Sequence, residues 1–145
     1  MHLSTLQKKM LLKMRWERFP VARFELRNDR EEDLAMTALD DVWMQKPEDS
    51  METVKERSAA LRELEEAGFI QIHFAVPAVV AGDHMVYYKS ELYALLCKTA
   101  LEAAQLPDHL FNLPCLCKGY AEPTLQGRRA VRKLLARRRM ERLSR

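Results

Sequence analysis

The chain is short of the residues that mark several common protein classes. Its 145 residues contain three cysteines and four glycines, and aromatic residues make up only 8%. An odd and small number of cysteines argues against the disulfide framework of a small secreted protein. No apolar stretch approaches the roughly 18 residues of a membrane span, and the N-terminus lacks the apolar core of a signal peptide. We therefore expect a cytoplasmic protein with no membrane contact.

Signatures of catalysis and of cofactor binding are missing too. The sequence has no nucleophile elbow, phosphate-binding loop, dinucleotide fingerprint or zinc-protease motif. Cys115 and Cys117 form a lone C-x-C pair, without the four converging ligands or the C-x2-C spacing of zinc modules. Free thiols in a loop bounded by prolines are the simpler interpretation, with metal binding the less favoured one. We expect no enzyme activity, no catalytic residues, no cofactor and no metal.

Charge is present in quantity and is strongly segregated. Charged residues make up 31% and hydrophobic residues 48%, as in a globular chain of one domain. Residues 1–30 carry eight Lys/Arg against three Asp/Glu, residues 31–117 six against sixteen, and residues 118–145 ten against two. Basic ends on an acidic centre suit contact with a polyanion. They suit equally well an acidic core neutralised by its own tails or by those of a second subunit.

Apolar periodicity and capping residues predict an α+β chain that is mostly helical. A capping box at Ser4–Gln7 begins the first helix, and Gly68 ends a helix over Met51–Ala67. Trp16 and Trp43 are expected in the core. The predicted order over residues 4–89 is helix (to Arg18), strand (22–26), helix (Arg30–Gln45), helix (Met51–Ala67), strand (Phe69–Val76) and, after a Gly82-Asp83 turn, strand (Met85–Tyr88).

This order, with Leu61-Arg62-Glu63-Leu64-Glu65-Glu66-Ala67-Gly68-Phe69-Ile70 at its centre, resembles the winged helix-turn-helix superfamily of bacterial transcriptional regulators. The resemblance implies a winged-helix domain over 1–89 with the order helix-strand-helix-helix-strand-strand. Residues 90–145 would be a C-terminal helical extension, packed with it as one unit. That extension comprises a helix over Glu91–Gln105, an apolar connector from Pro107 to Gly119, and a basic helix from Pro123 to about Arg142.

The resemblance also implies that duplex DNA is the partner and that the helix Met51–Ala67 enters the major groove. Its candidate contacts are Thr53, Lys55 and Arg57. The sequence itself predicts that the basic end helices supply the electrostatic attraction to phosphates. The last helix is the stronger candidate, and its expected contacts are Arg128, Arg129, Arg132, Lys133, Arg137, Arg138 and Arg139.

Two features favour a different function. The helix Met51–Ala67 carries five acidic residues against three basic ones, and the wing tip 77–82 has no Lys or Arg. An exposed apolar wing would sooner pack on a neighbouring subunit or a protein partner. A wing covered by the terminal helices of its own chain fits the sequence equally well. The leading hypothesis is a homodimeric, DNA-binding transcriptional regulator, because helices that flank a domain often pair across a two-fold axis. The alternative is a winged-helix protein interaction module that reads no DNA sequence.

Overall fold

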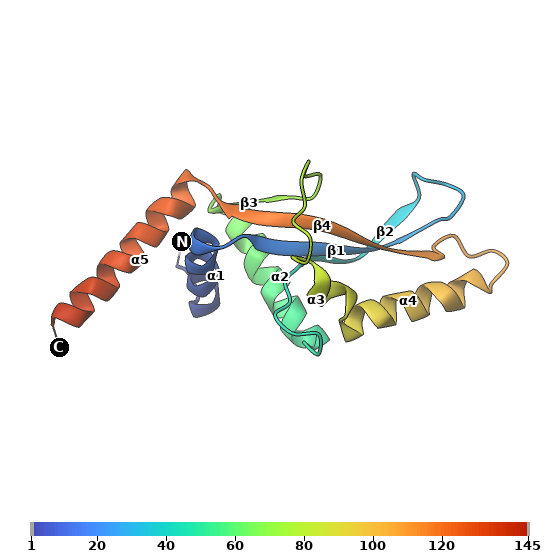
Figure 1. Ribbon diagram of the computed structural model, residues 1–145, viewed down its shortest axis with the longest axis horizontal. Helices are drawn as coiled ribbons and strands as arrows, with labels where there is room; N and C mark the ends of the chain where they lie inside the picture. Colours follow the sequence, from blue (N-terminus) through green and yellow to red (C-terminus); the bar gives the residue numbers. More distant parts are fainter. Residues whose placement is uncertain (1, 145) are drawn as a thin grey trace.

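The computed structural model describes residues 2–144, which form an α+β fold of five helices and a four-stranded antiparallel sheet (Figure 1). Four longer helices each begin at a Ser or Thr whose side chain accepts a hydrogen bond from a first-turn amide. In chain order the elements are α1 (Thr5–Trp16), β1 (Phe19–Arg27), β2 (Ala35–Val42), α2 (Met51–Glu66), β3 (Ile70–His73), α3 (Met85–Tyr88), α4 (Glu91–Ala104), β4 (Leu113–Pro123) and α5 (Leu125–Leu143).

The sheet joins the two halves of the chain. Its strand order is β2-β1-β4-β3, so the first and the last strand in sequence lie side by side at its centre. β1 and β4 pair along their whole shared length, from Phe19 opposite Ala121 to Arg27 opposite Leu113. β2 covers only the Arg27 end of β1, and β3 covers only the Pro123 end of β4. The molecule is elongated as a result (Figure 1).

Two clusters of buried side chains lie along this sheet. The first joins α1, α2 and α5 to Phe19 and Val21 of β1. The second joins α2, α3 and α4 to Phe24 and Leu26 of the same strand. In the view of Figure 1, α1 to α4 lie below the strands, whereas α5 extends from the left end of the sheet beside α1. The protein therefore has one continuous sheet with a helical layer and one projecting helix.

The expected helix ends are confirmed where a cap defines them. The capping box between Ser4 and Gln7 forms, with the Gln7 amide 3.1 Å from the Ser4 hydroxyl. α2 and α4 match their predicted ranges within one residue. Gly68 adopts a φ of 84°, the left-handed conformation that glycine allows, and leads directly into β3.

The prediction of a helix over Arg30–Gln45 is wrong, because this segment contains strand β2. Leu34, Ala38 and Val42 are spaced by four residues, which is close to one helical turn but is also two periods of a strand. The strand pairs with β1, with Ala35 opposite Arg27 and Val42 opposite Ala22. The order helix-strand-helix-helix-strand-strand is therefore not the order observed.

The prediction that Met85–Tyr88 is the second strand of a wing is also wrong. These residues form the short helix α3, and β3 pairs with β4 instead. Tyr87 explains the difference, since its buried hydroxyl donates a 2.6 Å hydrogen bond to the Pro20 carbonyl and so pins the turn beneath the sheet. The apolar segment 77–82 is a loop that crosses the edges of β4 and β1 in Figure 1.

The expected helical extension over 90–145 is wrong at its centre. Leu113–Pro123, placed in the sequence within an apolar connector and at the start of the last helix, is the central strand β4. Pro114 and Pro123 lie near its two ends, where the sheet tolerates a residue without an amide proton. Cys115 and Cys117 consequently lie in a strand and not in a loop.

Asp41, at the end of β2, predicts a stability change with pH. Burial, reinforced by Asp40 and Glu65, raises the pKa of this carboxyl to about 6. Its ionisation therefore opposes folding above the unfolded pKa of about 4, and fully so above 6. Asp41→Asn, which tolerates the local φ of 47°, should raise the free energy of unfolding by about 3 kcal/mol at pH 7. Urea denaturation at pH 4 should show no such gain; an equal gain at both pH values would contradict this assignment.

Candidate nucleic-acid interface

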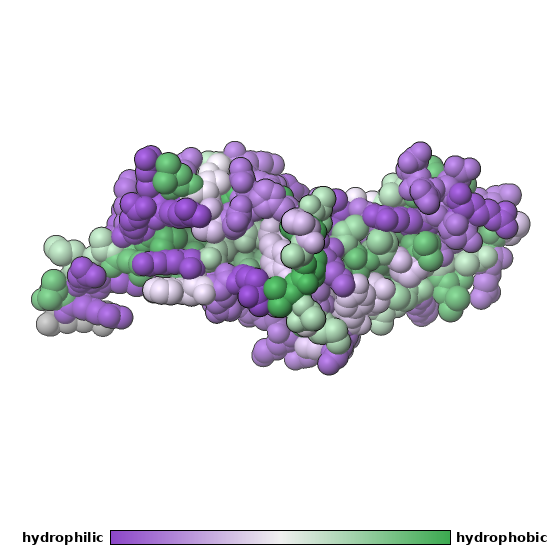
Figure 2. All heavy atoms as spheres, turned by 45° about the horizontal axis from the view of Figure 1, so that its top comes forward, coloured by the Kyte–Doolittle hydropathy of each residue, from purple (hydrophilic) through white to green (hydrophobic). Residues whose placement is uncertain are grey.

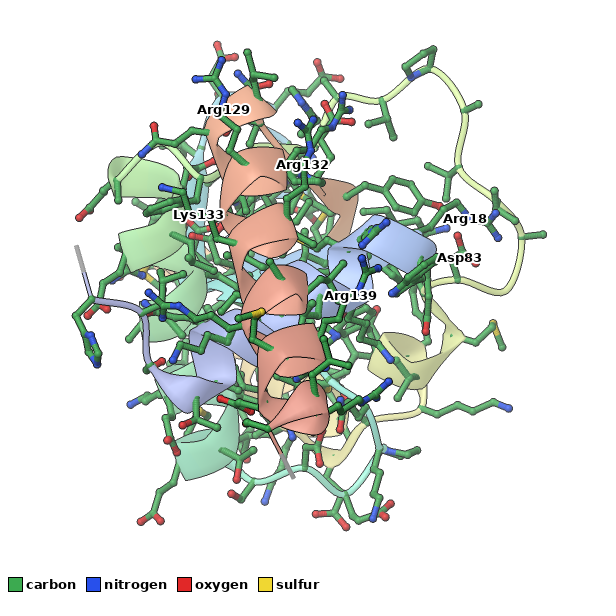
Figure 3. The ribbon with its side chains drawn as sticks, turned by 90° about the vertical axis from the view of Figure 1, so that its left-hand side faces the viewer. Arg18, Asp83, Arg129, Arg132, Lys133 and Arg139 are labelled. Carbon is green, nitrogen blue, oxygen red and sulfur yellow. The ribbon has the colours of Figure 1, made fainter. Side chains whose placement is uncertain are left out.

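The expected basic helix is α5, and it exposes nearly all of its length. Thr124 caps it, its hydroxyl accepting a 3.1 Å hydrogen bond from the Gly127 amide. Only Gly127 and Val131 are buried, so one narrow stripe holds the helix on the rest of the molecule. Figure 3 shows Arg129, Arg132, Lys133 and Arg139 along its outward side. All eight cations from the predicted range are exposed: Arg128, Arg129, Arg132, Lys133, Arg137, Arg138, Arg139 and Arg142.

The cations of α5 are not neutralised by the acidic part of the chain. The ion pairs found among residues 2–144 all use other cations. Lys13 of α1 pairs with Glu17, the C-cap residue of that helix, and Arg18 makes two hydrogen bonds to Asp83, at 2.8 and 3.3 Å. The interpretation that the basic tail folds back onto the acidic centre therefore lacks direct contacts in this part of the chain. The charge of α5 remains free for an external anion.

A narrow groove runs along one side of α5, where it packs on α1. It has a volume of about 270 Å³ and is lined by Met14, Pro123 and Val131 together with three guanidinium groups, those of Arg15, Arg128 and Arg132. No carboxylate lines it. Closely spaced cations without a counter-charge are the usual chemistry of phosphate recognition.

A second groove lies beside α5, near the N-terminal end of α1. Its volume is about 440 Å³, and it is lined by four cations. Like the first groove, it has no carboxylate in its lining. The four cations are Lys8 from α1 and Arg129, Lys133 and Arg137 from α5. Two cationic grooves beside one exposed basic helix form a single surface, which we call the α5 surface: Lys8, Arg15, and the Arg and Lys residues of α5 from Arg128 to Arg142.

Lys8 and Arg15 of α1 belong to this surface, although the sequence named individual contacts only on the last helix. Their apolar neighbours Met10, Leu11 and Met14 are buried, which turns Lys8 and Arg15 toward the sides of α5. Trp16, expected in the core, is 71% exposed, and the Arg15 guanidinium lies 4.5 Å from the centre of its ring. The only sequence signal was the clustering of cations at both ends of the chain.

The predicted contacts on α2 are placed differently. Thr53 accepts a 3.0 Å hydrogen bond from the capping Ser50 hydroxyl, and Lys55 is exposed. Arg57 points inward, where its guanidinium lies 2.7 Å from the Asp49 carboxylate and 3.3 Å from the Trp43 carbonyl. α1 stands between α2 and α5 in Figure 1. The structure therefore does not join the α2 candidates to the α5 surface, and their contact with DNA stays a prediction.

The ion pair of Arg57 predicts a pH-dependent stabilisation. Burial alone would raise the pKa of Asp49, but hydrogen bonds from the Gln45 amide, Arg57 and the Lys46 amide outweigh it and hold the pKa low. The stabilisation is thus present above the unfolded pKa of about 4 and is lost as the pH falls through the folded pKa. Asp49→Asn should cost about 2 kcal/mol at pH 7, measured by urea denaturation. The cost should shrink below pH 4; a constant cost would contradict the ion pair.

The apolar loop 77–82 is anchored at its end. The Val80 amide donates a 3.0 Å hydrogen bond to the Tyr120 hydroxyl, which itself donates to Asp83 at 2.9 Å. The hydrogen bond from Arg18 contributes most to lowering the pKa of Asp83. Val79 and Val80 remain more than 40% exposed, so the loop offers an apolar surface.

No protein-family model matches the chain, and neither a curated protein nor a solved structure matches it. Among the described residues, no helix combines the length and the apolar character needed to cross a membrane. The function must therefore be argued from the surface of the molecule.

Proposed function

We propose that this protein binds duplex DNA and that the α5 surface makes the main contact. The observation that supports the proposal most strongly is the row of α5 cations that no carboxylate neutralises among the described residues. A helix of 19 residues is about 28 Å long, and DNA carries one phosphate charge per about 1.7 Å of its axis. The helix can thus meet several phosphates at once.

Contact of this kind positions a protein on DNA but reads no sequence by itself. Selectivity would come from α2, through Thr53 and Lys55, or from side chains of α5 in a groove. One feature still agrees with the winged-helix resemblance: α2 ends at Gly68, and strand β3 follows it. The proposal does not depend on that resemblance. Its regulatory part, a homodimeric transcriptional regulator, depends on sequence-selective binding.

The proposal predicts a steep salt dependence. A labelled duplex of 20 base pairs and random sequence should bind tightly at 50 mM salt, with the logarithm of the affinity falling linearly with the logarithm of salt concentration. Each phosphate contact contributes about −0.9 to the slope, so five contacts give about −4.5. Fluorescence anisotropy measures both quantities. Absence of binding at 50 mM salt, or a slope near zero, would refute the proposal.

The alternative, a protein interaction module, has its own supporting observation. A run of leucines on α4 and the segment that follows it is more than half exposed: Leu95, Leu101, Leu106 and Leu110. Apolar side chains also show in Figure 2 at the end of the molecule opposite α5. Exposed apolar groups of this kind often mark protein interfaces. Equilibrium sedimentation of the DNA-free protein tests whether two copies pair into the expected homodimer.

A further inference from the structure

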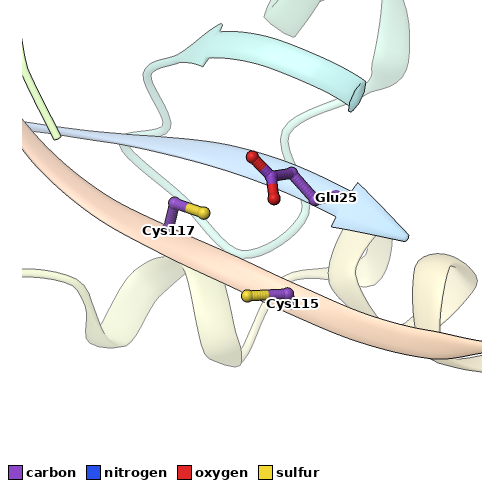
Figure 4. A group of neighbouring side chains, drawn as sticks. All are labelled: Glu25, Cys115 and Cys117. Atoms are coloured by element: carbon purple, nitrogen blue, oxygen red, sulfur yellow. The ribbon is translucent and has the colours of Figure 1, made fainter. Parts of the chain in front are cut away.

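A cluster of three potential metal ligands lies on the central strands, away from α5. Cys115 and Cys117 are two residues apart on β4, so their side chains lie on the same face of the sheet. Glu25 of β1 is directly opposite Cys115 in the ladder. One ligand atom from each residue lies within 4.8 Å of the other two, and Figure 4 shows the three side chains together.

We propose that Glu25, Cys115 and Cys117 bind one zinc ion, with a water molecule as the fourth ligand. Zinc prefers thiolate, imidazole and carboxylate ligands in a tetrahedron, with zinc–sulfur bonds of about 2.3 Å. Two such sulfur atoms are about 3.8 Å apart, so side-chain rotation alone can bring these ligands into place. In the sequence, no further metal ligand could be assigned to the Cys115–Cys117 pair. The pairing of β1 with β4 brings Glu25 next to it as a third ligand.

Two arginines support the ligands from outside. The Nε of Arg27 donates a 2.8 Å hydrogen bond to Oε2 of Glu25, and its Nη2 donates to the Cys117 sulfur at 3.4 Å. Oε1 of Glu25 has no hydrogen-bond donor among the described residues; Arg23 Nη1 is 3.8 Å away. Outer partners of this kind orient metal ligands and steady their charge. Glu25 is only 7% exposed, so its Oε1 is largely shielded from solvent.

The charge of the cluster also suits a divalent ion. Binding releases the protons of both thiols to solvent, so one Zn²⁺ replaces two protons and the net charge does not change.

A disulfide is the weaker explanation of the same pair. Residues two apart in a strand have Cα atoms separated by about 6.6 Å. That separation is close to the longest Cα–Cα distance found in disulfides, and the two side chains point in the same direction rather than toward each other. A metal ion bridges the pair without distorting β4.

Cobalt(II) tests the proposal, because it replaces zinc and reports its ligands by absorption. The full chain, without an affinity tag and with a phosphine reductant, should bind one Co²⁺ with sulfur-to-cobalt charge-transfer bands, and Zn²⁺ should displace it. Cys115→Ser and Cys117→Ser should each weaken binding at least tenfold. Cys97→Ser, on α4 and outside the cluster, is the matched control and should bind as the wild type does. Absence of the charge-transfer bands, or their persistence when both Cys115 and Cys117 are replaced, would overturn the proposal.

Glu25→Gln tests the third ligand. It should weaken cobalt binding at least tenfold but keep the charge-transfer bands, since both thiolates remain. Glu25 also forms an ion pair with Arg27, so its replacement could disturb the sheet. Circular dichroism of each variant checks that the sheet is intact. Unchanged affinity in a folded Glu25→Gln variant would overturn the three-ligand site.

Discussion

Replacing Arg129, Arg132, Lys133 and Arg137 by Gln should weaken binding to random duplex DNA by at least 100-fold at 100 mM salt. All four are exposed and in no ion pair among the described residues, so their removal leaves the fold intact. The salt dependence should change as well. Each lost phosphate contact should make the slope shallower by about 0.9, or by up to about 3.6 for four contacts. Fluorescence anisotropy against salt concentration measures both effects.

The matched control removes the same charge elsewhere. Arg30, Lys46, Lys89 and Lys98 are exposed, form no ion pair in the described part of the chain, and lie outside α1 and α5. Their replacement by Gln should change the affinity only through the long-range field, which salt screens beyond about 10 Å at 0.1 M. Equal losses in the two variants would show that total charge matters and the α5 surface does not.

Gly127→Ala should destabilise the protein by about 3 kcal/mol. A Cβ at this position would overlap the carbonyl oxygen of Phe69 and lie 3.2 Å from Cβ of Pro123. The Phe69 carbonyl cannot move easily, because it already accepts a 3.0 Å hydrogen bond from the Thr124 amide. The added methyl group must therefore push the first turn of α5 off the β3 end of the sheet. Urea denaturation at pH 7 measures the loss.

Gly82→Ala is the control for this substitution. A Cβ there would meet no atom within 4 Å, although the φ of 91° is unfavourable for alanine. Its cost should be about 1 kcal/mol, the ordinary penalty of a left-handed residue. Gly127→Ala should also weaken DNA binding, because the same contact orients α5. A Gly127→Ala protein as stable as the wild type would contradict this account of how α5 is held.

The sequence predicted the elements whose ends are set by local chemistry. Ser4, Ser50 and Ser90 cap their helices through contacts within three residues, so the pattern sufficed to place α1, α2 and α4. β2 was mistaken for a helix since an apolar spacing of four fits both periods. Its identity depends on pairing with β1, a contact that no local pattern contains.

Neither strand β4 nor the buried contacts of Arg57 could be predicted, for the same reason. Leu113–Pro123 becomes a strand between β1 and β3, both distant in sequence. Pro114 suggested a loop, and Pro123 suggested the first turn of the last helix. The position of Arg57 is set by Asp49 and Trp43, so its type and spacing did not reveal that it points inward. The basic helix α5 was predicted from eight Arg and Lys residues around a short apolar stripe. The sequence left open whether these cations pair with the acidic centre of the chain.

Lysine protection tests the central claim most directly, since one experiment reports on both candidate helices. The folded protein is acetylated briefly with and without a saturating amount of duplex DNA, and each lysine is quantified by mass spectrometry. Lys133 on α5 and Lys8 beside it should be protected by DNA, whereas Lys98 on α4 should react equally in both samples. Protection of Lys55 as well would add α2 to the interface. If Lys133 and Lys8 react as fast with DNA as without it, the α5 surface is not where this protein binds DNA.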